Sequence, residues 1–235
     1  MRIKIEFELQ DITTININYS YYIASLIYRC IQLSDPALSL ELHKPGIKLW
    51  TFSRLIVPNR KFKIVKDEMI IESDKVYLYF STPKSDIATA FIEGLIKKDE
   101  IKICNAKFNL SKIEVVKERK IGNKAKFVTL SPISVTTVRD GKTYDLYPNE
   151  PKFYENLKNN LIKKYKVLYG KEPSNYQLEI RPLKVKPKRI KIKDTFHRCV
   201  DMVFKAEGCE DLLKIGYQAG FGERNSMGFG MVKVV

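Results

Sequence analysis

Apolar residues recur along the first half of the chain at spacings that separate strands from helices. The N-terminal stretch RIKIEFEL alternates apolar and polar residues as a half-buried strand does, whereas residues 20–33 repeat apolar residues at the i, i+3, i+4, i+7 spacing of an amphipathic helix. The apolar face of this helix consists of Ile23, Leu26, Ile27, Cys30 and Ile31. A short second helix, ALSLELHK, is expected next, because Ser34-Asp35-Pro36 supplies a cap and a first-turn proline, and Pro45-Gly46 stops it.

The rest of the chain continues the same alternation of element types. KLWTFSRLIV, KIVKDEMIIE and KVYLYFST are strand-like, SDIATAFIEGLIKK is helix-like, and IKICNAKFNLSKIEVV is a final strand stretch of the first half. The second half repeats this order with strand-like KFVTLSPISVTTV and KTYDLY, a helix over 150–170 closed by Gly170, a long strand region, helix-like EDLLKIGYQAG and a terminal strand. Two successive βαββαβ units predict an α+β fold of two tandem ferredoxin-like (RRM-like) domains with antiparallel sheets.

The polar, basic stretch 118-ERKIGNKAK-126 is the expected boundary between the two domains. We therefore expect an N-terminal domain over residues 1–118 and a C-terminal domain over residues 119–235. A chain of 235 residues is long enough to bury a core in each half.

The charge of the chain narrows the class of partner. Forty-two Lys and Arg residues against 27 Asp and Glu residues give a net charge of +15, which favours a polyanion, either nucleic acid or an anionic membrane surface. No stretch approaches the length of a membrane span, and Met1 leads directly into a strand with no signal-peptide core, so nucleic acid is the better fit and no membrane is expected.

Cysteine and histidine usage argues against a metal or another cofactor. The four cysteines form no CxxC pair, and only two histidines are present, so a zinc site is not expected. These cysteines are Cys30, Cys104, Cys199 and Cys209. A reducing, cytoplasmic location fits this usage best.

Five of the eleven glycines lie in the terminal stretch 216-GYQAGFGERNSMGFGMVKV-234. A helix-like segment precedes them and a short strand ends the chain, so neither a dinucleotide fingerprint nor a P-loop fits, because both need a helix that opens after the glycines. The loop either acts through its own amides and the side chains of Glu223, Arg224, Asn225 and Ser226, or is a structural turn.

A second basic feature is the stretch 184-KVKPKRIKIK-193. Lys184, Lys186 and Lys188 fall on one face of a strand, and a break is expected from Pro187 to Arg189 before the strand continues. The stretch is either a charged edge strand that discourages aggregation or a track for phosphates.

Three segments together resemble a known family. The terminal GFGERNSMGFGMVKV, the middle stretch 127-FVTLSPISVTTVRDGKTYD-145 and the early YYIASLIYR and LH are similar to the CRISPR-associated endoribonucleases that process repeat RNA, the sixth Cas family. The resemblance covers nearly the whole chain and keeps the motifs in order. It implies paired ferredoxin-like domains and metal-independent cleavage, in which a ribose 2′-oxygen attacks the adjacent phosphate to leave a 5′-hydroxyl and a cyclic phosphate or a phosphate derived from it.

The partner that the resemblance implies is CRISPR repeat RNA within a precursor transcript. Proteins of a CRISPR effector complex remain open as further partners, and the chain is expected to be a monomer or a homodimer. Two other functions stay open as well: a repeat-binding paralogue with little or no cleavage, and a structural subunit of an effector complex.

Cleavage by a 2′-oxygen requires proton transfers that histidine performs well, because its ordinary pKa of about 6.5 lies near neutral pH. His43 and His197 are the two candidates. His197 lies in strand-like DTFHRCVDMVF, where it packs on a sheet face or meets solvent. The resemblance selects His43, because the histidine of the family follows the tyrosine-bearing helix in this way.

Tyr28 and Lys48 complete the catalytic set that the resemblance implies. The apolar face of the first helix centres roughly 130° from Tyr28, so we expect this tyrosine to point away from the core and to be free to meet RNA. By resemblance it assists proton transfer or orients the ribose. Lys48 resembles the lysine that stabilises the transition state, with Lys44 as the alternative because the preceding turn varies in the family.

The resemblance also implies an RNA-binding role for both basic and glycine-rich segments. Glycines are expected to bring the terminal loop close to RNA phosphates at the cleft between the domains, with Arg224 and Asn225 as anchors and Ser226 as a helper. The expected RNA-binding residues are Gly220, Gly222, Arg224, Asn225, Ser226, Gly228, Lys184, Lys186, Lys188 and Arg189.

Overall fold

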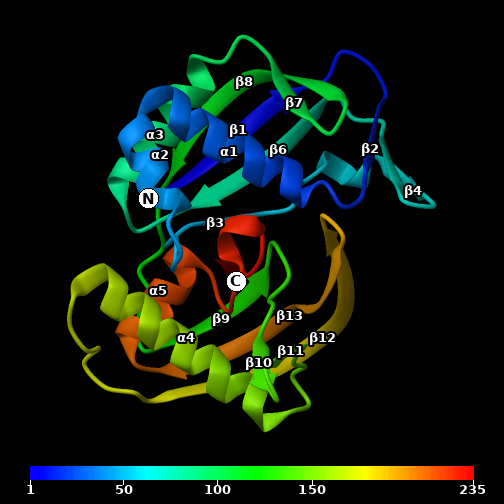
Figure 1. Cartoon of the computed structure of the whole chain (residues 1–235). Coiled ribbons are helices and arrows are strands. Elements are labelled where there is room, and N and C mark those ends of the chain that lie inside the picture. The colour runs from blue at the N-terminus through cyan, green and yellow to red at the C-terminus, as the bar shows by residue number, and fades with distance from the viewer.

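Most strands and helices of the first half lie where the apolar pattern predicts them. The computed structural model describes all residues, 1–235 (Figure 1). Its first half contains β1 (Arg2–Glu8), β2 (Thr13–Asn16), α1 (Ser20–Ser34), α2 (Pro36–His43), β3 (Thr51–Phe52), the 3₁₀ turn η1 (Pro58–Arg60), β4 (Phe62–Val65), β5 (Glu68–Ile71), β6 (Lys75–Ser81), α3 (Ser85–Ile96), β7 (Ile101–Ile103) and β8 (Ala106–Val116).

The second half repeats the unit, and the second and third strands of that unit form one long hairpin. Its elements are β9 (Lys124–Thr129), β10 (Thr136–Arg139), β11 (Lys142–Asp145), α4 (Pro151–Tyr169), β12 (Leu178–Ile192), β13 (Thr195–Gly208), α5 (Glu210–Ala219), the 3₁₀ turn η2 (Asn225–Met227) and β14 (Val232–Val234). None of the helices is long and apolar enough to cross a membrane.

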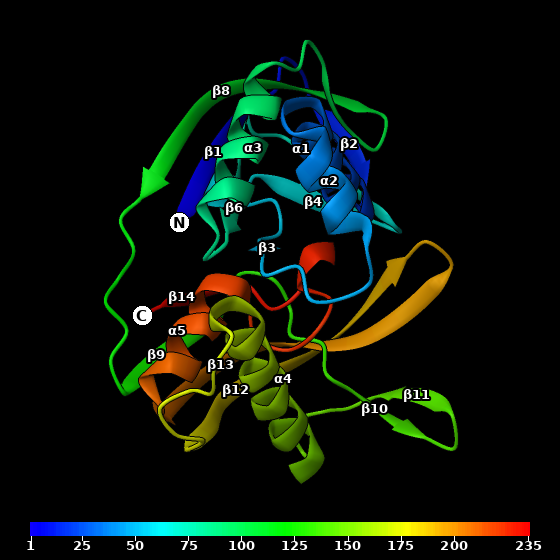
Figure 2. The same cartoon turned by 60° about the vertical axis from the view of Figure 1, so that its left-hand side comes forward.

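The two main sheets have the same topology. The N-terminal sheet has the order β3-β6-β1-β8-β7 and the C-terminal sheet the order β12-β13-β9-β14, and neighbouring strands in both are antiparallel. In each, the second, third, first and fourth strands of a βαββαβ unit lie side by side. Helices α1 and α3 cover one face of the first sheet, and α4 and α5 cover one face of the second (Figure 1, Figure 2). The predicted tandem ferredoxin-like fold is confirmed.

The predicted apolar face of α1 is confirmed in the N-terminal core. Its five residues, Ile23, Leu26, Ile27, Cys30 and Ile31, are all buried. The cap of α2 also forms as expected, since the Asp35 carboxylate accepts a hydrogen bond of 2.9 Å from the Leu38 amide. Helix α2 then ends at His43, one residue before the expected end of ALSLELHK.

Helices α1 and α3 approach each other so closely that one position must be glycine. A Cβ atom on Gly94 would lie 1.8 Å from the carbonyl oxygen of Cys30. Backbone therefore packs on backbone at this crossing, which holds α1 in a fixed place over the sheet.

The predicted strand over 48–57 is wrong for most of its length. Only Thr51 and Phe52 form a strand that pairs with β6, and Ile56 adds an isolated bridge to Tyr77 of β6, because the chain crosses between the domains here. Leu49 takes a left-handed backbone conformation with φ 53° and packs into the C-terminal core, whereas Trp50 packs into the N-terminal core. One short segment thus joins the cores of both domains.

The break expected at Pro187 to Arg189 is also wrong. β12 runs without interruption from Leu178 to Ile192, and its pairing with β13 shifts register between Pro182 and Lys184. Because β12 is the edge strand of its sheet, its prolines can be accommodated without the loss of an interior ladder hydrogen bond.

The connection between β8 and β9 covers residues 117–123, and the stretch 118–126 expected as the domain boundary overlaps this connection and the first residues of β9. Here Glu118 binds the N-terminal ammonium group at 2.8 Å. Next to this pair, the buried Arg2 guanidinium donates to the Tyr217 carbonyl oxygen at 2.9 Å and lies 3.9 Å over the Tyr217 ring. The first strand of one domain is therefore tied to the last helix of the other.

The contact at Gly94 predicts that Gly94→Ala destabilises the protein. Alanine favours a helix over glycine by about 1 kcal/mol, but the added methyl group must push α1 and α3 apart, so we expect the free energy of unfolding to fall by about 2 kcal/mol. Gly122→Ala is the control, because no atom lies within 4 Å of the added Cβ there. Chemical denaturation of both variants measures the effect, and equal stability of Gly94→Ala and the parent would contradict the prediction.

Candidate functional site

The segment 220–230, here called the glycine loop, lies between the two domains and packs on β3. A Cβ atom on Gly228 would lie 2.6 Å from the Phe52 ring, and one on Gly220 would lie 3.1 Å from the Thr51 Cβ. The Thr51 hydroxyl donates a hydrogen bond of 2.9 Å to the Phe229 carbonyl oxygen. The close approaches that require these glycines are therefore approaches to protein atoms.

Gly220, Gly222 and Gly228 are all buried. Gly222 would place a Cβ atom 2.4 Å from the Ser134 carbonyl oxygen. The structure thus explains the glycines through packing, and their expected contact with RNA stays a prediction.

Asn225 holds the glycine loop together from inside. Its side chain is buried, and its amide nitrogen donates to the carbonyl oxygens of Phe221, at 3.3 Å, and Phe229, at 2.9 Å. The amide of Phe221 also donates to the Gly230 carbonyl oxygen at 2.8 Å. Asn225 therefore has a structural role within the loop. Its expected role as an RNA anchor stays a prediction.

Tyr28 and His43 lie together where the glycine loop meets α1. Their ring centroids are 5.0 Å apart, and the Tyr28 ring is 5.5 Å from the Trp50 ring. The helix geometry had indicated that Tyr28 points away from the core toward solvent. In the structure these neighbours cover part of the ring, so Tyr28 is half-buried. Burial raises the pKa of the Tyr28 hydroxyl, and the nearby Ser226 hydroxyl of the glycine loop only partly offsets this. The phenol therefore keeps its proton at neutral pH and can donate a hydrogen bond.

His43 ends α2 with its imidazole exposed. Its Nδ1 atom lies 2.7 Å from the carbonyl oxygen of Ser39. Because a carbonyl oxygen can only accept, this contact assigns the N–H to Nδ1 in the neutral ring and leaves Nε2 free to take up a proton. The ring is held by the helix and offers one nitrogen to a ligand.

Lys48 lies in a pocket next to this pair. Its ammonium group donates to the Lys44 carbonyl oxygen, and both lysines line a cavity of about 520 Å³ together with Lys84 and the α4 residues Val167 and Leu168. Partial burial lowers the pKa of Lys48. The structure thus brings Tyr28, His43 and Ser226 together and leaves Lys48 and Lys44 in the neighbouring pocket.

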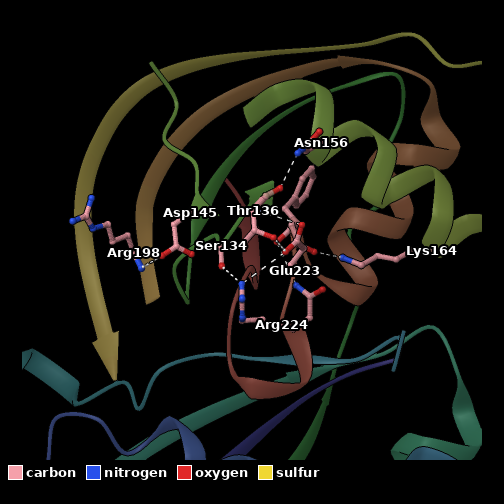
Figure 3. Close-up of polar contacts among 11 residues, drawn as sticks. Ser134, Thr136, Asp145, Asn156, Lys164, Arg198, Glu223 and Arg224 are labelled. Atoms are coloured by element: carbon pink, nitrogen blue, oxygen red, sulfur yellow. Dashed lines mark hydrogen bonds and ion pairs between the residues drawn. The ribbon is translucent and has the colours of Figure 1, made fainter. Parts of the chain in front are cut away.

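A buried lysine that the sequence analysis missed holds the other side of the glycine loop. Lys164 of α4 is 2% exposed, and its ammonium group donates to the carbonyl oxygens of Gly220, at 2.6 Å, and Gly222, at 2.7 Å (Figure 3). Burial lowers the pKa of Lys164 to about 7, an effect that Glu223 opposes. The signal was present in the sequence, because Lys164 continues the apolar stripe of its helix. The buried residues of this stripe are Phe153, Leu157, Leu161, Lys164 and Tyr165.

The middle motif supports the glycine loop from the side. The Glu223 carboxylate accepts a hydrogen bond of 2.6 Å from the Thr136 hydroxyl, and Arg224 donates to the Ser134 hydroxyl at 3.1 Å (Figure 3). Asn156 of α4 donates to the Thr136 carbonyl oxygen at 2.7 Å. These contacts fix the start of β10 against the loop, so the middle and terminal motifs form one structural unit.

His197 lies on β13 beside the glycine loop. Its ring centroid is 6.2 Å from that of Phe229. Burial and, to a smaller extent, the Arg224 charge lower the pKa of His197. This histidine therefore packs on a sheet face, one of the two arrangements expected for it.

Three of the basic residues of β12 lie on the open face of the C-terminal sheet. Lys184, Lys186 and Lys188 oppose Val203, Asp201 and Cys199 of β13, which point away from the helices. Lys184 and Lys186 are exposed, whereas Lys188 is half-buried and lies 3.8 Å from Asp201. Arg189 points to the other face and lies 3.9 Å over the Phe196 ring.

Comparisons with known proteins cover the whole chain. Residues 14–114 match the family model "CRISPR-associated protein Cas6, N-terminal", and residues 116–234 match "CRISPR associated protein Cas6, C-terminal". The chain is 44% identical over 238 residues to "CRISPR-associated endoribonuclease Cas6 1" of Methanocaldococcus jannaschii, covering 99% of this chain and 92% of the relative. It is 43% identical over 220 residues to "CRISPR-associated endoribonuclease Cas6" of Pyrococcus furiosus, covering 92% of this chain and 82% of the relative.

A solved structure of "an RAMP protein binding different RNA substrates" superposes on the chain with a TM-score of 0.92. Its sequence is 36% identical, and the superposition covers 100% of this chain and 99% of that protein.

The buried amine of Lys164 predicts a pH-dependent contribution to stability. Burial lowers its pKa from 10.5 to about 7, so the unfolded chain binds more protons than the folded protein between these values, and the contribution of Lys164 to stability rises with pH across this window. We expect the free energy of unfolding of the parent, relative to Lys164→Met, to increase by about 2 kcal/mol from about pH 7 to about pH 9.

Urea denaturation of both proteins at the two pH values measures this difference. Lys163→Met is the control, because the neighbouring Lys163 side chain is exposed and changes its surroundings little on folding. A difference between the parent and Lys164→Met that is the same at both pH values would rule out a titrating buried amine.

Proposed function

This chain belongs to the Cas6 family of CRISPR-associated proteins, and on that basis we propose that it binds CRISPR repeat RNA and cleaves the precursor transcript within repeats. Both relatives at 43% and 44% identity carry the name endoribonuclease, and the matches extend over both domains. The observation that carries the proposal is the pairing of Tyr28 with His43 at 5.0 Å, beside Ser226 of the glycine loop.

The proposed reaction is metal-independent attack of a ribose 2′-oxygen on the adjacent phosphate. One proton must leave the 2′-hydroxyl and one must reach the departing 5′-oxygen. We assign proton transfer to His43, because Nε2 is the free nitrogen of an exposed ring whose Nδ1 is held by the Ser39 carbonyl oxygen. The products are a 5′-hydroxyl and a cyclic phosphate or a phosphate derived from it.

Tyr28 acts in this proposal as a hydrogen-bond donor. Burial raises the pKa of its phenol, so it is poorly suited to remove a proton from a sugar hydroxyl. A protonated phenol next to His43 can instead orient the ribose or donate to an oxygen of the reacting phosphate. Ser226 would fix the direction of the phenol and so link the glycine loop to the reaction.

Several cations are available to hold the RNA and to offset the charge that develops on the phosphate. We propose Lys48 for the second task, with Lys44 as the alternative, because both follow His43 closely in the chain and line the same cavity. Lys184, Lys186, Lys188 and Arg189 would hold the RNA backbone on β12, and Arg224 would do so at the glycine loop. The net charge of +15 supports this role.

A second candidate function is RNA binding without cleavage. A protein that superposes with a TM-score of 0.92 is described as binding different RNA substrates, and the same fold would allow this chain to do so. The Tyr28 and His43 pair favours the enzyme, because the two side chains lie together and Nε2 of His43 is free to act on a ligand.

We expect His43→Ala to slow cleavage while leaving RNA binding nearly unchanged. Lysine and arginine side chains carry the proposed phosphate binding, whereas loss of general acid-base catalysis should reduce the single-turnover rate by about 10²- to 10⁴-fold. The rate is measured on repeat RNA with protein in excess, and affinity is measured on the same RNA with the attacking 2′-hydroxyl replaced by hydrogen.

His197→Ala is the control, because that histidine lies against Phe229 on the other side of the glycine loop and should keep the parent's rate within a few-fold. Parent-like cleavage by His43→Ala would overturn the catalytic assignment. A parent protein that binds the repeat and never cuts it would favour the RNA-binding function.

A further inference from the structure

Two adjacent tyrosines near the start of α1 lie at the protein surface. Tyr22 is 47% exposed and Tyr21 is half-buried, and their ring centroids are 6.0 Å apart in an edge-to-face arrangement. Neither ring belongs to the N-terminal core. Both rings therefore have free surface for a flat ligand.

These tyrosines form the wall between two surface pockets. A pocket of about 420 Å³ on one side and a pocket of about 400 Å³ on the other are both lined by Tyr21 and Tyr22. The charged residues that line the two pockets are Arg29, Lys98, Glu100 and Lys102 on the first side, and Asp67, Lys191 and Lys193 on the second.

Positive charge dominates both pockets. The carboxylate of Glu100 is already paired with Lys102 at 2.6 Å and with Lys107 at 2.8 Å, so it does not neutralise the remaining cations. On the other side, Lys191 and Lys193 face the single carboxylate of Asp67. Each pocket thus suits an anionic ligand that carries a planar group.

The tip of the β12–β13 hairpin completes the second pocket from the other domain. The Lys191 amide donates to the Asn18 side-chain oxygen at 2.9 Å, and the Lys193 ammonium lies 5.2 Å from the Tyr21 ring centroid. Figure 2 shows the hairpin curving from the C-terminal sheet up to the N-terminal domain. The open-face lysines of β12 therefore lead along the hairpin toward the two tyrosines.

The position of the tyrosines on α1 relates them to the catalytic pair. Tyr21, Ser25 and Tyr28 are spaced at i, i+4 and i+7, so they lie along one side of the helix. At a rise of 1.5 Å per residue, Tyr21 lies about 10 Å along the helix axis from Tyr28. A strand whose phosphate reaches His43 would place its neighbouring nucleotides near Tyr21.

We propose that Tyr21 and Tyr22 form a stacking site for unpaired nucleotides of the repeat RNA that flank the cleaved phosphate. The surrounding lysines and Arg29 hold the phosphates of these nucleotides while the rings stack on the bases. Aromatic stacking tolerates any base, so the site positions the strand without reading its sequence. This inference rests on the proposed function and extends it to the segment of RNA beside the reaction.

The double variant Tyr21→Ala/Tyr22→Ala tests the stacking site. We expect it to bind uncleavable repeat RNA, with hydrogen in place of the attacking 2′-hydroxyl, about 10- to 100-fold more weakly than the parent. Tyr21→Phe/Tyr22→Phe should restore affinity, because phenylalanine also stacks. Tyr144→Ala is the matched control, since Tyr144 is equally exposed, at 47%, on β11.

An RNA with an abasic nucleotide at successive positions beside the cleavage site locates the stacked base. One such position should weaken binding to the parent and have no further effect on the alanine variant. Tyr22→Ala alone provides the same test if the double variant does not fold. If the alanine variants bind repeat RNA as tightly as the parent, and the parent cleaves normally, the stacking site is overturned and the proposed function is not. A parent that neither binds nor cleaves repeat RNA overturns the proposed function and the stacking site together.

Discussion

The glycine loop can occupy its place between the domains only because glycine, which has no Cβ atom, stands where the loop meets β3 and where it meets its own backbone. Gly228 lies against the Phe52 ring, Gly220 lies against Thr51, and Gly230 would place a Cβ atom 1.9 Å from the Phe221 carbonyl oxygen. Lys164 holds the same loop from the opposite side through two carbonyl oxygens. The loop is therefore clamped between α4 of one domain and β3 of the other, and this fixes Ser226 next to Tyr28.

The contacts that hold the glycine loop between α4 and β3 explain why a reaction site can form from two ferredoxin-like domains. The N-terminal domain supplies Tyr28 and His43 from two consecutive helices, and α1 is fixed by its backbone contact with Gly94 of α3. The C-terminal domain supplies the glycine loop and the basic face of β12. Leu49 crosses into the C-terminal core just after the segment that carries His43 and Lys48, so a movement between the domains would disturb the site. The proposed chemistry thus depends on the contact between the domains as much as on the catalytic side chains.

Local patterns in the sequence were sufficient to predict the fold and the main elements. The apolar face of α1, the Asp35 cap of α2 and the repeated βαββαβ order all depend on residues close together in the chain, and each is confirmed. The pairing of Tyr28 with His43 is not a local property, because Trp50 from a later segment covers the Tyr28 ring and makes it half-buried. Leu49 and Trp50 looked like part of a regular strand, whereas in the structure they enter two different cores.

Polar residues whose partners are distant were the hardest to interpret. Lys164 sits on the apolar stripe of α4, and only the fold shows that its partners are the carbonyl oxygens of Gly220 and Gly222.

The most direct measurement of the central claim uses repeat RNA in which the 2′-hydroxyl of the ribose at the cleaved phosphate is replaced by hydrogen. EDTA is present throughout. We expect the unmodified RNA to be cut to a 5′-hydroxyl product, and the modified RNA to be bound with similar affinity and to remain intact. Cleavage of the modified RNA, or a requirement for added magnesium, would contradict cleavage by the ribose hydroxyl.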